Sequence, residues 1–165
     1  MGLMSFFKTA GEKLFGSGEA KAAQEAAAAA PTPEKVTALS NAAGKAIATY
    51  IGTQGLSAQG LDIGFDGASA TVTVAGVVPD QATKEKIVLC CGNVLGVAAV
   101  NDMLVVKAPE PESQWHTVVS GDNLSKIAKQ FYGDANKYPI IFEANKPMLT
   151  NPDLIYPGQI FSVPD

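Results

Sequence analysis

The spacing of apolar residues changes period several times along the chain, and each change predicts a new element. Between Thr32 and Gly52, apolar residues return every three to four positions, which is the period of one buried helix face. Thr32 suits the N-cap and Pro33 the first helical turn. The face consists of Val36, Leu39, Ala43, Ala46, Ile47, Tyr50 and Ile51. We therefore predict one long amphipathic helix, ended by Gly52 and Gly55.

Strict alternation of apolar and polar residues follows this helix and predicts a β-hairpin. The alternating positions are Leu61, Ile63 and Phe65 before the Asp66-Gly67 turn and Ala70, Val72 and Val74 after it. A second helix is predicted from Pro79-Asp80 to about Gly92, and one more strand from Val100 to Val106. The partly buried residues of this second helix are predicted to be Ile87, Leu89, Cys90 and Cys91. The predicted order of this α+β unit is α-β-β-α-β.

The last third of the chain predicts a second, smaller α+β unit of the order β-α-α-β. A short β-type run at 116–119 precedes a Gly-Asp turn, and then Leu124, Ile127, Ala128 and Phe131 recur at helical spacing. Asp122 or Asn123 is expected to cap this helix, and Gly133 is expected to stop it in a left-handed conformation.

A second helix of this unit is predicted to start at Asn136, with Pro139 tolerated in its first turn. Tyr138, Ile141 and Phe142 are expected to face the core. A loop then leads through the Tyr156-Pro157-Gly158 turn into a final strand over 159–163, which is expected to pair with 116–119.

The N-terminal segment 1–16 predicts a short amphipathic helix over residues 3–15. Its apolar face holds Leu3, Phe6, Phe7, Ala10 and Leu14. Gly11 can break this helix, and the break would free the carbonyls of Phe7 and Ala10 from their helical partners. Residues 17–32 form an Ala-rich spacer. We place the first domain at 33–107, a Pro-containing linker at 108–114 and the second domain at 115–165; the linker is short enough for the domains to touch.

Charge and composition argue against several classes of function. The chain has 165 residues, a formal net charge of −4 and no run of Lys or Arg, so it lacks the clustered positive charge that nucleic acids or anionic lipid surfaces require. No apolar run is long enough to span a membrane. Lys8 interrupts the first apolar run too early for a secretory signal. We therefore predict a cytoplasmic protein.

The reactive residue types are too sparse to build a catalytic site. The single histidine, His116, lies far in sequence from the two cysteines. Cys90 and Cys91 are adjacent, and we interpret them as two reduced core residues. Zinc-ligand spacing, a nucleophile elbow and a phosphate-binding loop are all missing from the sequence. The sequence therefore predicts a binding protein rather than an enzyme.

Residues 115–164 resemble a LysM module. The matching positions are His116-Thr117-Val118, Ser120-Gly121-Asp122, Leu124, Ile127-Ala128, Tyr132-Gly133, Ile141, Asn145, Ile155-Tyr156-Pro157-Gly158-Gln159 and Val163-Pro164. The resemblance implies a shallow groove for N-acetylglucosamine polymers, such as peptidoglycan fragments. Two loops would form it, namely Gly121, Asp122, Asn123 and Leu124, and Asn151, Pro152, Asp153, Leu154, Ile155 and Tyr156. The alternative is purely structural: Gly121 and Gly158 serve turns, Leu124 and Ile155 the core, and Asp122 a helix cap.

The region 36–107 resembles a BON domain. The predicted order α-β-β-α-β fits, and so do Gly76 at the end of the second strand and the closing residues Asn93, Gly96-Val97, Val100 and Asp102. BON domains are also associated with phospholipid surfaces. The resemblance therefore leaves open an envelope-associated stress protein as an alternative function.

The pairing of one BON and one LysM domain resembles the family of bacterial cytosolic potassium-binding proteins. Matching segments outside the domain motifs are Met1-Gly2-Leu3, Ala10-Gly11-Glu12-Lys13-Leu14, Lys84-Glu85-Lys86-Ile87 and 141–149. The resemblance implies a cytoplasmic ion sensor that binds K⁺ and changes conformation on binding. We expect a monomer in which Rb⁺ or Cs⁺ can take the place of K⁺. Backbone carbonyls suit a large monovalent cation, and we expect those of Phe7 and Ala10 to contribute together with BON loops.

Overall fold

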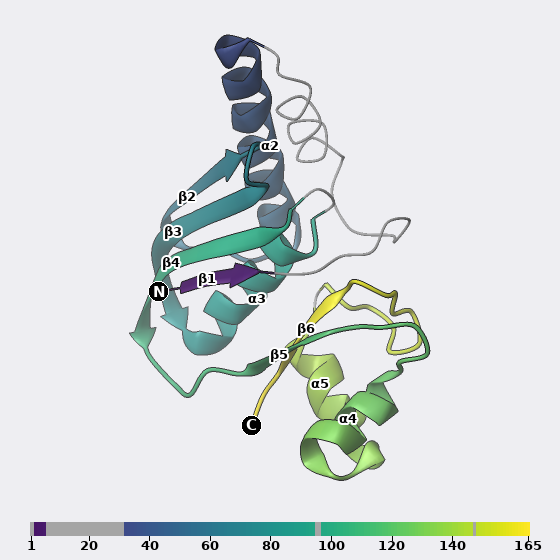
Figure 1. Ribbon diagram of the computed structural model, residues 1–165. Coiled ribbons are helices and arrows are strands. Elements are labelled where there is room, and N and C mark those ends of the chain that lie inside the picture. The colour runs from purple at the N-terminus through teal and green to yellow at the C-terminus, as the bar shows by residue number, and fades with distance from the viewer. Residues whose placement is uncertain (1, 6–31, 95–96, 147) are drawn as a thin grey trace.

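The computed structural model describes residues 2–5, 32–94, 97–146 and 148–165 (Figure 1). It contains a four-stranded sheet covered by helices, followed by a smaller unit with a two-stranded sheet and its own helices. Both units mix helices and strands, which confirms the predicted α+β class. None of the helices among the described residues has an apolar stretch that could span a lipid bilayer.

The first unit follows the predicted order of elements. Helix α2 (Pro33–Thr53) precedes β2 (Gln59–Asp66), β3 (Thr71–Asp80), α3 (Gln81–Gly92) and β4 (Ala99–Ala108). Strands β2 and β3 form the predicted antiparallel hairpin, and α3 carries the chain over to β4, which runs parallel to β3. A crossover helix is the usual way to join two parallel neighbours. Helix α3 is therefore the crossover connection of this sheet.

The caps of these two helices differ from each other. Thr32 occupies the N-cap of α2, but its side chain makes no capping hydrogen bond. Asp80 caps α3, because its carboxylate accepts from the amide of Thr83 at 2.7 Å. This hydrogen bond lowers the pKa of Asp80.

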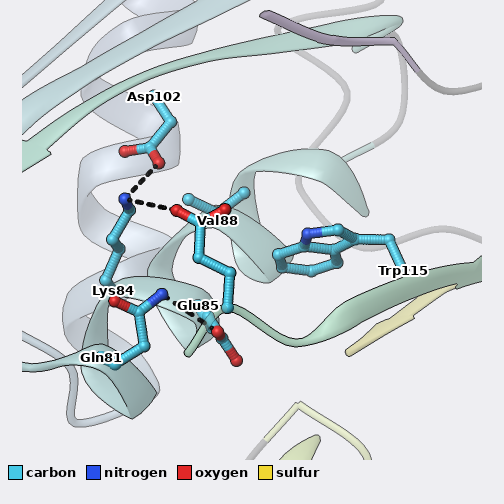
Figure 2. Close-up of a pocket in the computed structure, with 7 residues that line it drawn as sticks. Gln81, Lys84, Glu85, Val88, Asp102 and Trp115 are labelled. Atoms are coloured by element: carbon cyan, nitrogen blue, oxygen red, sulfur yellow. Dashed lines mark hydrogen bonds and ion pairs between the residues drawn. The ribbon is translucent and has the colours of Figure 1, made fainter. Parts of the chain in front are cut away.

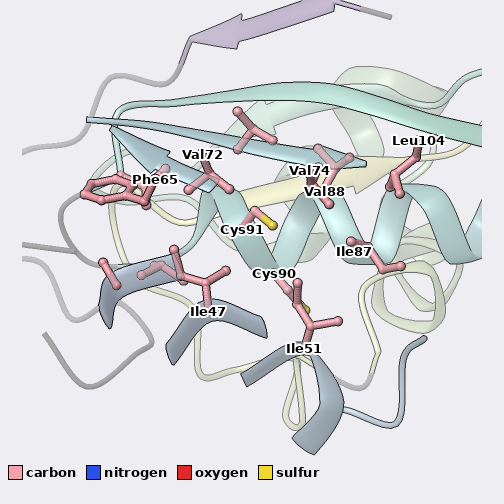
Figure 3. Close-up of a cluster of buried hydrophobic side chains, with 14 of the residues drawn as sticks. Ile47, Ile51, Phe65, Val72, Val74, Ile87, Val88, Cys90, Cys91 and Leu104 are labelled. Carbon is pink, nitrogen blue, oxygen red and sulfur yellow. The ribbon is translucent and has the colours of Figure 1, made fainter. Parts of the chain in front are cut away.

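Helices α2 and α3 bury a common core against the sheet (Figure 3). The side chains labelled there are Ile47 and Ile51 from α2, Phe65, Val72, Val74 and Leu104 from the strands, and Ile87, Val88, Cys90 and Cys91 from α3. Both cysteines are free thiols, as predicted. Burial raises the pKa of Cys90 to about 12 and raises that of Cys91 as well, so both are protonated and unreactive near neutral pH.

The N-terminal prediction is wrong for the residues that the structure describes. Gly2–Ser5 form strand β1, not the start of a helix, and pair antiparallel with β4 at one edge of the sheet. The strand order is β1-β4-β3-β2. A free strand edge offers a row of backbone donors and acceptors, which outweighs the local helix propensity of four residues. The remainder of the predicted helix and the 17–32 spacer lie outside the described residues.

The second unit contains β5 (Gln114–Thr117), α4 (Leu124–Tyr132), a 3₁₀ turn η1 (Ala135–Lys137), α5 (Tyr138–Ala144) and β6 (Ile160–Val163). The predicted pairing of its first and last strands is confirmed, since β5 and β6 are antiparallel. Of the two predicted caps of α4, the structure uses Asn123, whose side chain accepts from the amide of Lys126. Gly133 ends α4 at φ 73°, as predicted.

Two predictions for the following helix are wrong. The side chain that caps the turn is that of Asp134, which accepts from the amide of Asn136, and α5 starts two residues after Asn136. Tyr138 is 37% exposed and does not enter the core, whereas Ile141 is fully buried. The 3₁₀ turn rotates the start of α5, so the face expected from straight helical spacing is displaced.

A second core fills the smaller unit, and one of its members comes from the larger unit. Leu89 of α3 is 1% exposed and belongs to the same cluster as Leu124, Ile141 and Phe161. Trp115 of β5 packs against both cores. The two domains are therefore in close contact through α3, as the short linker predicted.

Candidate functional site

The carbonyls that the sequence assigned to a cation belong to Phe7 and Ala10, and both lie outside the residues that the structure describes. The last described residue before them is Ser5, which pairs with Ala99. At the same corner, the carbonyl of Ala70 accepts from the amides of Ala98 and Ala99. The assignment of Phe7 and Ala10 stays a prediction.

Two acidic side chains contact the ammonium group of Lys84. Lys84 of α3 places its ammonium group 3.1 Å from Asp102 Oδ2 of β4 and 3.4 Å from Glu112 Oε1 of the linker (Figure 2). Asp102 is 2% exposed, and its other oxygen accepts from the amide of Leu104. Among the described residues, no group of three or more His, Cys, Asp or Glu side chains is placed to hold a metal ion.

The charge of Lys84 is maintained inside the molecule by these two carboxylates. Burial alone would lower its pKa, but the hydrogen bond and attraction from Asp102, with a smaller contribution from Glu112, raise the pKa overall. A void of about 10 Å³ beside the ammonium is lined by Gln81, Val88 and Trp115, among others. That volume is about the minimum that can hold one water molecule.

Glu85, the next residue of α3, joins the larger domain to the linker and to the smaller domain. Its Oε1 accepts from the backbone amide of Ser113 at 2.9 Å and from Gln81 Nε2 at 3.1 Å. Its Oε2 accepts from the hydroxyl of Ser162 in β6 at 3.1 Å. One carboxylate thus holds three segments together.

The outer edge of β6 is completed by two asparagine side chains. Asn93, at the end of α3, accepts from Ile160 N at 2.8 Å and donates to Ile160 O at 3.0 Å. Asn145, at the end of α5, forms the same pair of hydrogen bonds with Ser162 N and O, at 2.8 and 2.7 Å. Both asparagines are fully buried. The first bridge joins the two domains, and the second stays within the smaller one.

The first predicted groove loop is braced by Asp122 rather than open to ligand on all sides. Its Oδ2 lies 2.8 Å from His116 Nε2 and accepts from Val119 N at 3.1 Å. Partial burial opposes its ionisation, but the hydrogen bond from His116 and that from Val119 lower the pKa overall. Gly121 and Asn123 are exposed, whereas Leu124 is buried in the core.

The second predicted groove loop lies beside the first. Val118 N donates to Gln159 O and Gly158 N donates to Val118 O, each at 2.8 Å, so the two loops start from adjoining strand ends. Figure 1 shows them at the same end of the β5–β6 sheet. Most residues of the second loop are exposed or half-buried, and Leu154 is 53% exposed. The structure therefore brings the two groups of predicted groove residues together.

The turn after the second loop contains a buried donor. Gln159 is 1% exposed; its Oε1 accepts from Tyr156 N at 3.0 Å, while its Nε2 has no hydrogen-bond partner among the described residues. Gly158 has a φ of 83°, which suits the predicted turn. The structural role foreseen for Gly158 and Leu124 is thus observed, alongside the exposed surface that a groove requires.

A wider cleft of about 470 Å³ lies between the two domains. It is lined by residues of α3, the linker, α5 and the C-terminal end of the chain. Its charged members are Glu85, Lys86, Glu110, Glu143 and Asp165. The cleft lies beside the contact between the domains, where Glu85 of α3 accepts a hydrogen bond from Ser162 of β6.

Comparison with known proteins supports both domain assignments. A BON domain model matches residues 45–108, and a LysM domain model matches residues 116–164. Over 166 aligned residues, covering 100% of this chain and 99% of the relative, the sequence is 40% identical to the potassium binding protein Kbp of Escherichia coli O6:H1. This chain belongs to the Kbp family. A Kbp-family chain therefore combines, in this order, the two domains whose contact is described above.

Shorter matches occur in proteins that share a segment with this Kbp-family chain. An uncharacterized protein of Deinococcus radiodurans is 49% identical over 49 residues, which are 30% of this chain and 19% of that protein. An esterase of Mycobacterium tuberculosis is 42% identical over 53 residues, 32% of this chain and 11% of the esterase. Such partial coverage shows a shared segment and does not transfer the esterase activity.

Sequence reasoning named the domains but missed the residues that join them. In the sequence, Asn93 belongs to the BON-like closing segment and Glu85 to a segment that matches the potassium-binding family, and neither pattern assigns a role to its residue. Asn93 contacts Ile160, 67 positions away, and Glu85 contacts Ser162, 77 positions away. A polar residue at the end of an apolar helix is a weak signal for such a bridge, because most of these residues face water.

Proposed function

We propose that this protein is a cytoplasmic potassium-binding protein that acts as an ion sensor. The observation that carries the proposal is the end-to-end match, at 40% identity, to a protein named for potassium binding. The match includes both domains and the connection between them. A role in binding rather than catalysis agrees with the two buried, protonated cysteines.

The chemistry of the described residues favours neutral oxygens as potassium ligands. The carboxylates of Asp102 and Glu112 already neutralise Lys84, and a cation placed there would compete with a tethered ammonium. Backbone carbonyls replace the hydration shell of K⁺ without such a competitor. We assign the carbonyls of Phe7 and Ala10 to this role, together with carbonyls of the BON loops. Rb⁺ and Cs⁺ would occupy the same site.

Ion binding would change the conformation by docking the N-terminal segment against the BON domain. Strand β1 already anchors the start of that segment to β4. The contacts of α3 with the linker and with β6 offer a route by which the change reaches the LysM domain. We expect a tighter contact between the domains in the bound form.

A thermal unfolding series tests the proposed function. The protein in sodium buffer is titrated with KCl, RbCl, CsCl or LiCl at constant ionic strength. Because a ligand that binds the folded form stabilises it by mass action, by about 2.7 kcal/mol at a hundredfold excess over Kd, the Tm is expected to rise with K⁺, Rb⁺ and Cs⁺ and to stay unchanged with Li⁺. A Tm that ignores all four cations would refute potassium binding.

The assignment of Phe7 and Ala10 is tested separately by carbon NMR of the backbone carbonyls. Their carbonyl resonances are expected to move with KCl at the concentrations that raise the Tm, and not with LiCl. Resonances of exposed carbonyls at a distance, such as that of Asp134, serve as the control. If potassium raises the Tm while the carbonyls of Phe7 and Ala10 do not respond, the ion is held elsewhere.

A second candidate function is binding of peptidoglycan fragments by the LysM domain. The observation that favours it is the pair of adjoining exposed loops, with Val119 59% and Leu154 53% exposed. Among the described residues, the domain contact uses β6, Trp115 and Met148 rather than the exposed parts of these loops. Pull-down on insoluble peptidoglycan is expected to retain the native protein and Ile140→Asp, an exposed position on α5, but to lose Leu154→Asp. Failure of the native protein to bind would remove this function.

A further inference from the structure

The side chain of Asn93 contacts both ends of one LysM loop. Its Nδ2 lies 3.1 Å from the sulfur of Met148 and 3.0 Å from the carbonyl of Ile160, and its Oδ1 accepts from Ile160 N. A bond from Nδ2 to Leu89 O, at 2.9 Å, fixes the amide on its own helix. A residue of the BON domain thus connects two points that are twelve positions apart in the LysM domain.

The segment between these two points carries the second groove loop. Asn151–Tyr156 lie inside it, and Gln159, which holds the amide of Tyr156, is the direct neighbour of Ile160. Leu149 N donates to Asn145 O just after Met148, so the entry to the loop is also fixed. The base of the loop is therefore held partly by its own domain and partly by α3.

We propose that Asn93 is a positioning residue that sets the conformation of the LysM groove loop from the BON domain. Its buried amide, 0% exposed, replaces a neighbouring strand at Ile160 and closes the loop at Met148. Displacement of α3 then shifts both ends of the loop together. An event in the BON domain is thereby linked to the groove, and the linkage is reciprocal for binding free energies.

Backbone hydrogen exchange of the full-length protein tests this role. The probes are the amides of Leu154 and Tyr156, which donate to Asn151 O and to Gln159 Oε1. In Asn93→Ala, we expect both amides to exchange at least about tenfold faster than in the native protein, because the base of the loop opens locally. Unchanged exchange at Leu154 and Tyr156 in this variant would overturn the proposal.

Asn145→Ala is the matched control. It removes the equivalent pair of side-chain hydrogen bonds from β6, at Ser162, and keeps the backbone carbonyl that accepts from Leu149 N at the entry to the loop. We expect faster exchange at Ser162 N and native exchange at Leu154 and Tyr156. Equal acceleration of the loop in both variants would mean general loosening of β6, which contradicts a specific role of Asn93.

A milder variant covers the case in which Asn93→Ala does not fold. Met148→Leu conserves volume in the core and removes the sulfur that accepts from Asn93. We expect a smaller acceleration of the same two amides, of roughly two- to fivefold. Native exchange in a folded Met148→Leu, together with an unfolded Asn93→Ala, would reduce Asn93 to a general stabilising residue and overturn the proposal.

The link to the ion rests on the proposed function and is tested with KCl against NaCl. Potassium is expected to slow exchange of Leu154 and Tyr156 in the native protein, and to lose this effect in Asn93→Ala while still raising the Tm. If potassium raises the Tm but leaves the loop unchanged in the native protein, the link fails and the proposed function stands. If potassium does not raise the Tm, the proposed function fails, and the comparison in NaCl still decides the positioning role.

Discussion

Lys84 shows how single side chains set the energetics of the domain contact. Its ammonium has two carboxylate partners that differ in exposure, since Asp102 is 2% exposed and Glu112 is 65% exposed. Removing one member of a buried ion pair leaves an uncompensated buried charge, which costs far more than the loss of an exposed pair. The two partners of one cation therefore provide an internal comparison.

We expect Asp102→Asn to lower the free energy of unfolding by about 3 kcal/mol or more. Glu112→Gln is expected to cost at most about 1 kcal/mol, because its carboxylate is exposed to water. Urea denaturation of the two variants at neutral pH measures the difference. Equal costs would show that Lys84 is solvated in solution and does not form the buried pair.

The carboxylate of Asp122 is expected to make the free energy of unfolding depend on pH in acid. Its pKa is lowered below 3.8 in the folded state by hydrogen bonds from His116 and Val119, so its contribution is present above the unfolded value and is lost as the pH falls through the folded value. We expect Asp122→Asn to cost about 1 kcal/mol at neutral pH and progressively less below pH 3.8. Unfolding free energies of both proteins at several pH values test this; a difference independent of pH would contradict it.

At the scale of elements, α2 lies so close to the sheet that one glycine is required. A Cβ added to Gly44 would lie 2.9 Å from the carbonyl oxygen of Ile63 in β2, whereas one added to Gly52 of the same helix would meet nothing within 4 Å. Both substitutions by alanine raise helix propensity by up to about 1 kcal/mol. The two substitutions differ in their packing: a methyl group at Gly44 meets the neighbouring strand, and one at Gly52 does not.

We therefore expect Gly44→Ala to destabilise the protein by about 1–3 kcal/mol, because α2 must move away from β2. Gly52→Ala is expected to leave stability unchanged or raise it slightly. Thermal unfolding of both variants measures the contrast. Stabilisation by Gly44→Ala would mean that helix and strand are farther apart than the structure shows.

Elements with a long apolar period were predictable, and short ones at a tertiary contact were not. The period that ends at Ile51 predicted α2, and Gly133 predicted the end of α4. Gly2–Ser5 gave the wrong element, because four residues carry too little local preference to resist pairing with β4. The start of α5 was misplaced because Asp134, two residues before Asn136, takes the capping role.

At the scale of the whole molecule, the two domains share a helix. Ile87 and Leu89 both belong to α3, yet Ile87 lies in the BON core and Leu89 in the LysM core. Each substitution by alanine removes a buried branched side chain, at a cost of about 2–5 kcal/mol. The loss of stability is expected in the BON domain for Ile87→Ala and in the LysM domain for Leu89→Ala.

We expect Leu89→Ala to weaken the LysM domain selectively, so that calorimetry resolves an early transition of that domain from the unfolding of the BON domain. Ile87→Ala is expected to lower the stability of the BON domain instead. Amide exchange assigns each effect to its domain. A uniform decrease across both domains with Leu89→Ala would indicate that they unfold as one cooperative unit.

The sequence by itself predicted most of the helices and strands and their order, because apolar periodicity and turn residues are local properties, and resemblance of its motifs to known families pointed to the two domains and the family. The LysM motif, which includes both Gly121 and Tyr156, also predicted that the two groups of groove residues lie together. Only the tertiary structure decided that Asn93, Glu85 and Leu89 join the domains. Those contacts join residues far apart in sequence, such as Asn93 and Ile160 at 67 positions or Glu85 and Ser162 at 77 positions, and neither spacing nor composition records which distant residues meet in space.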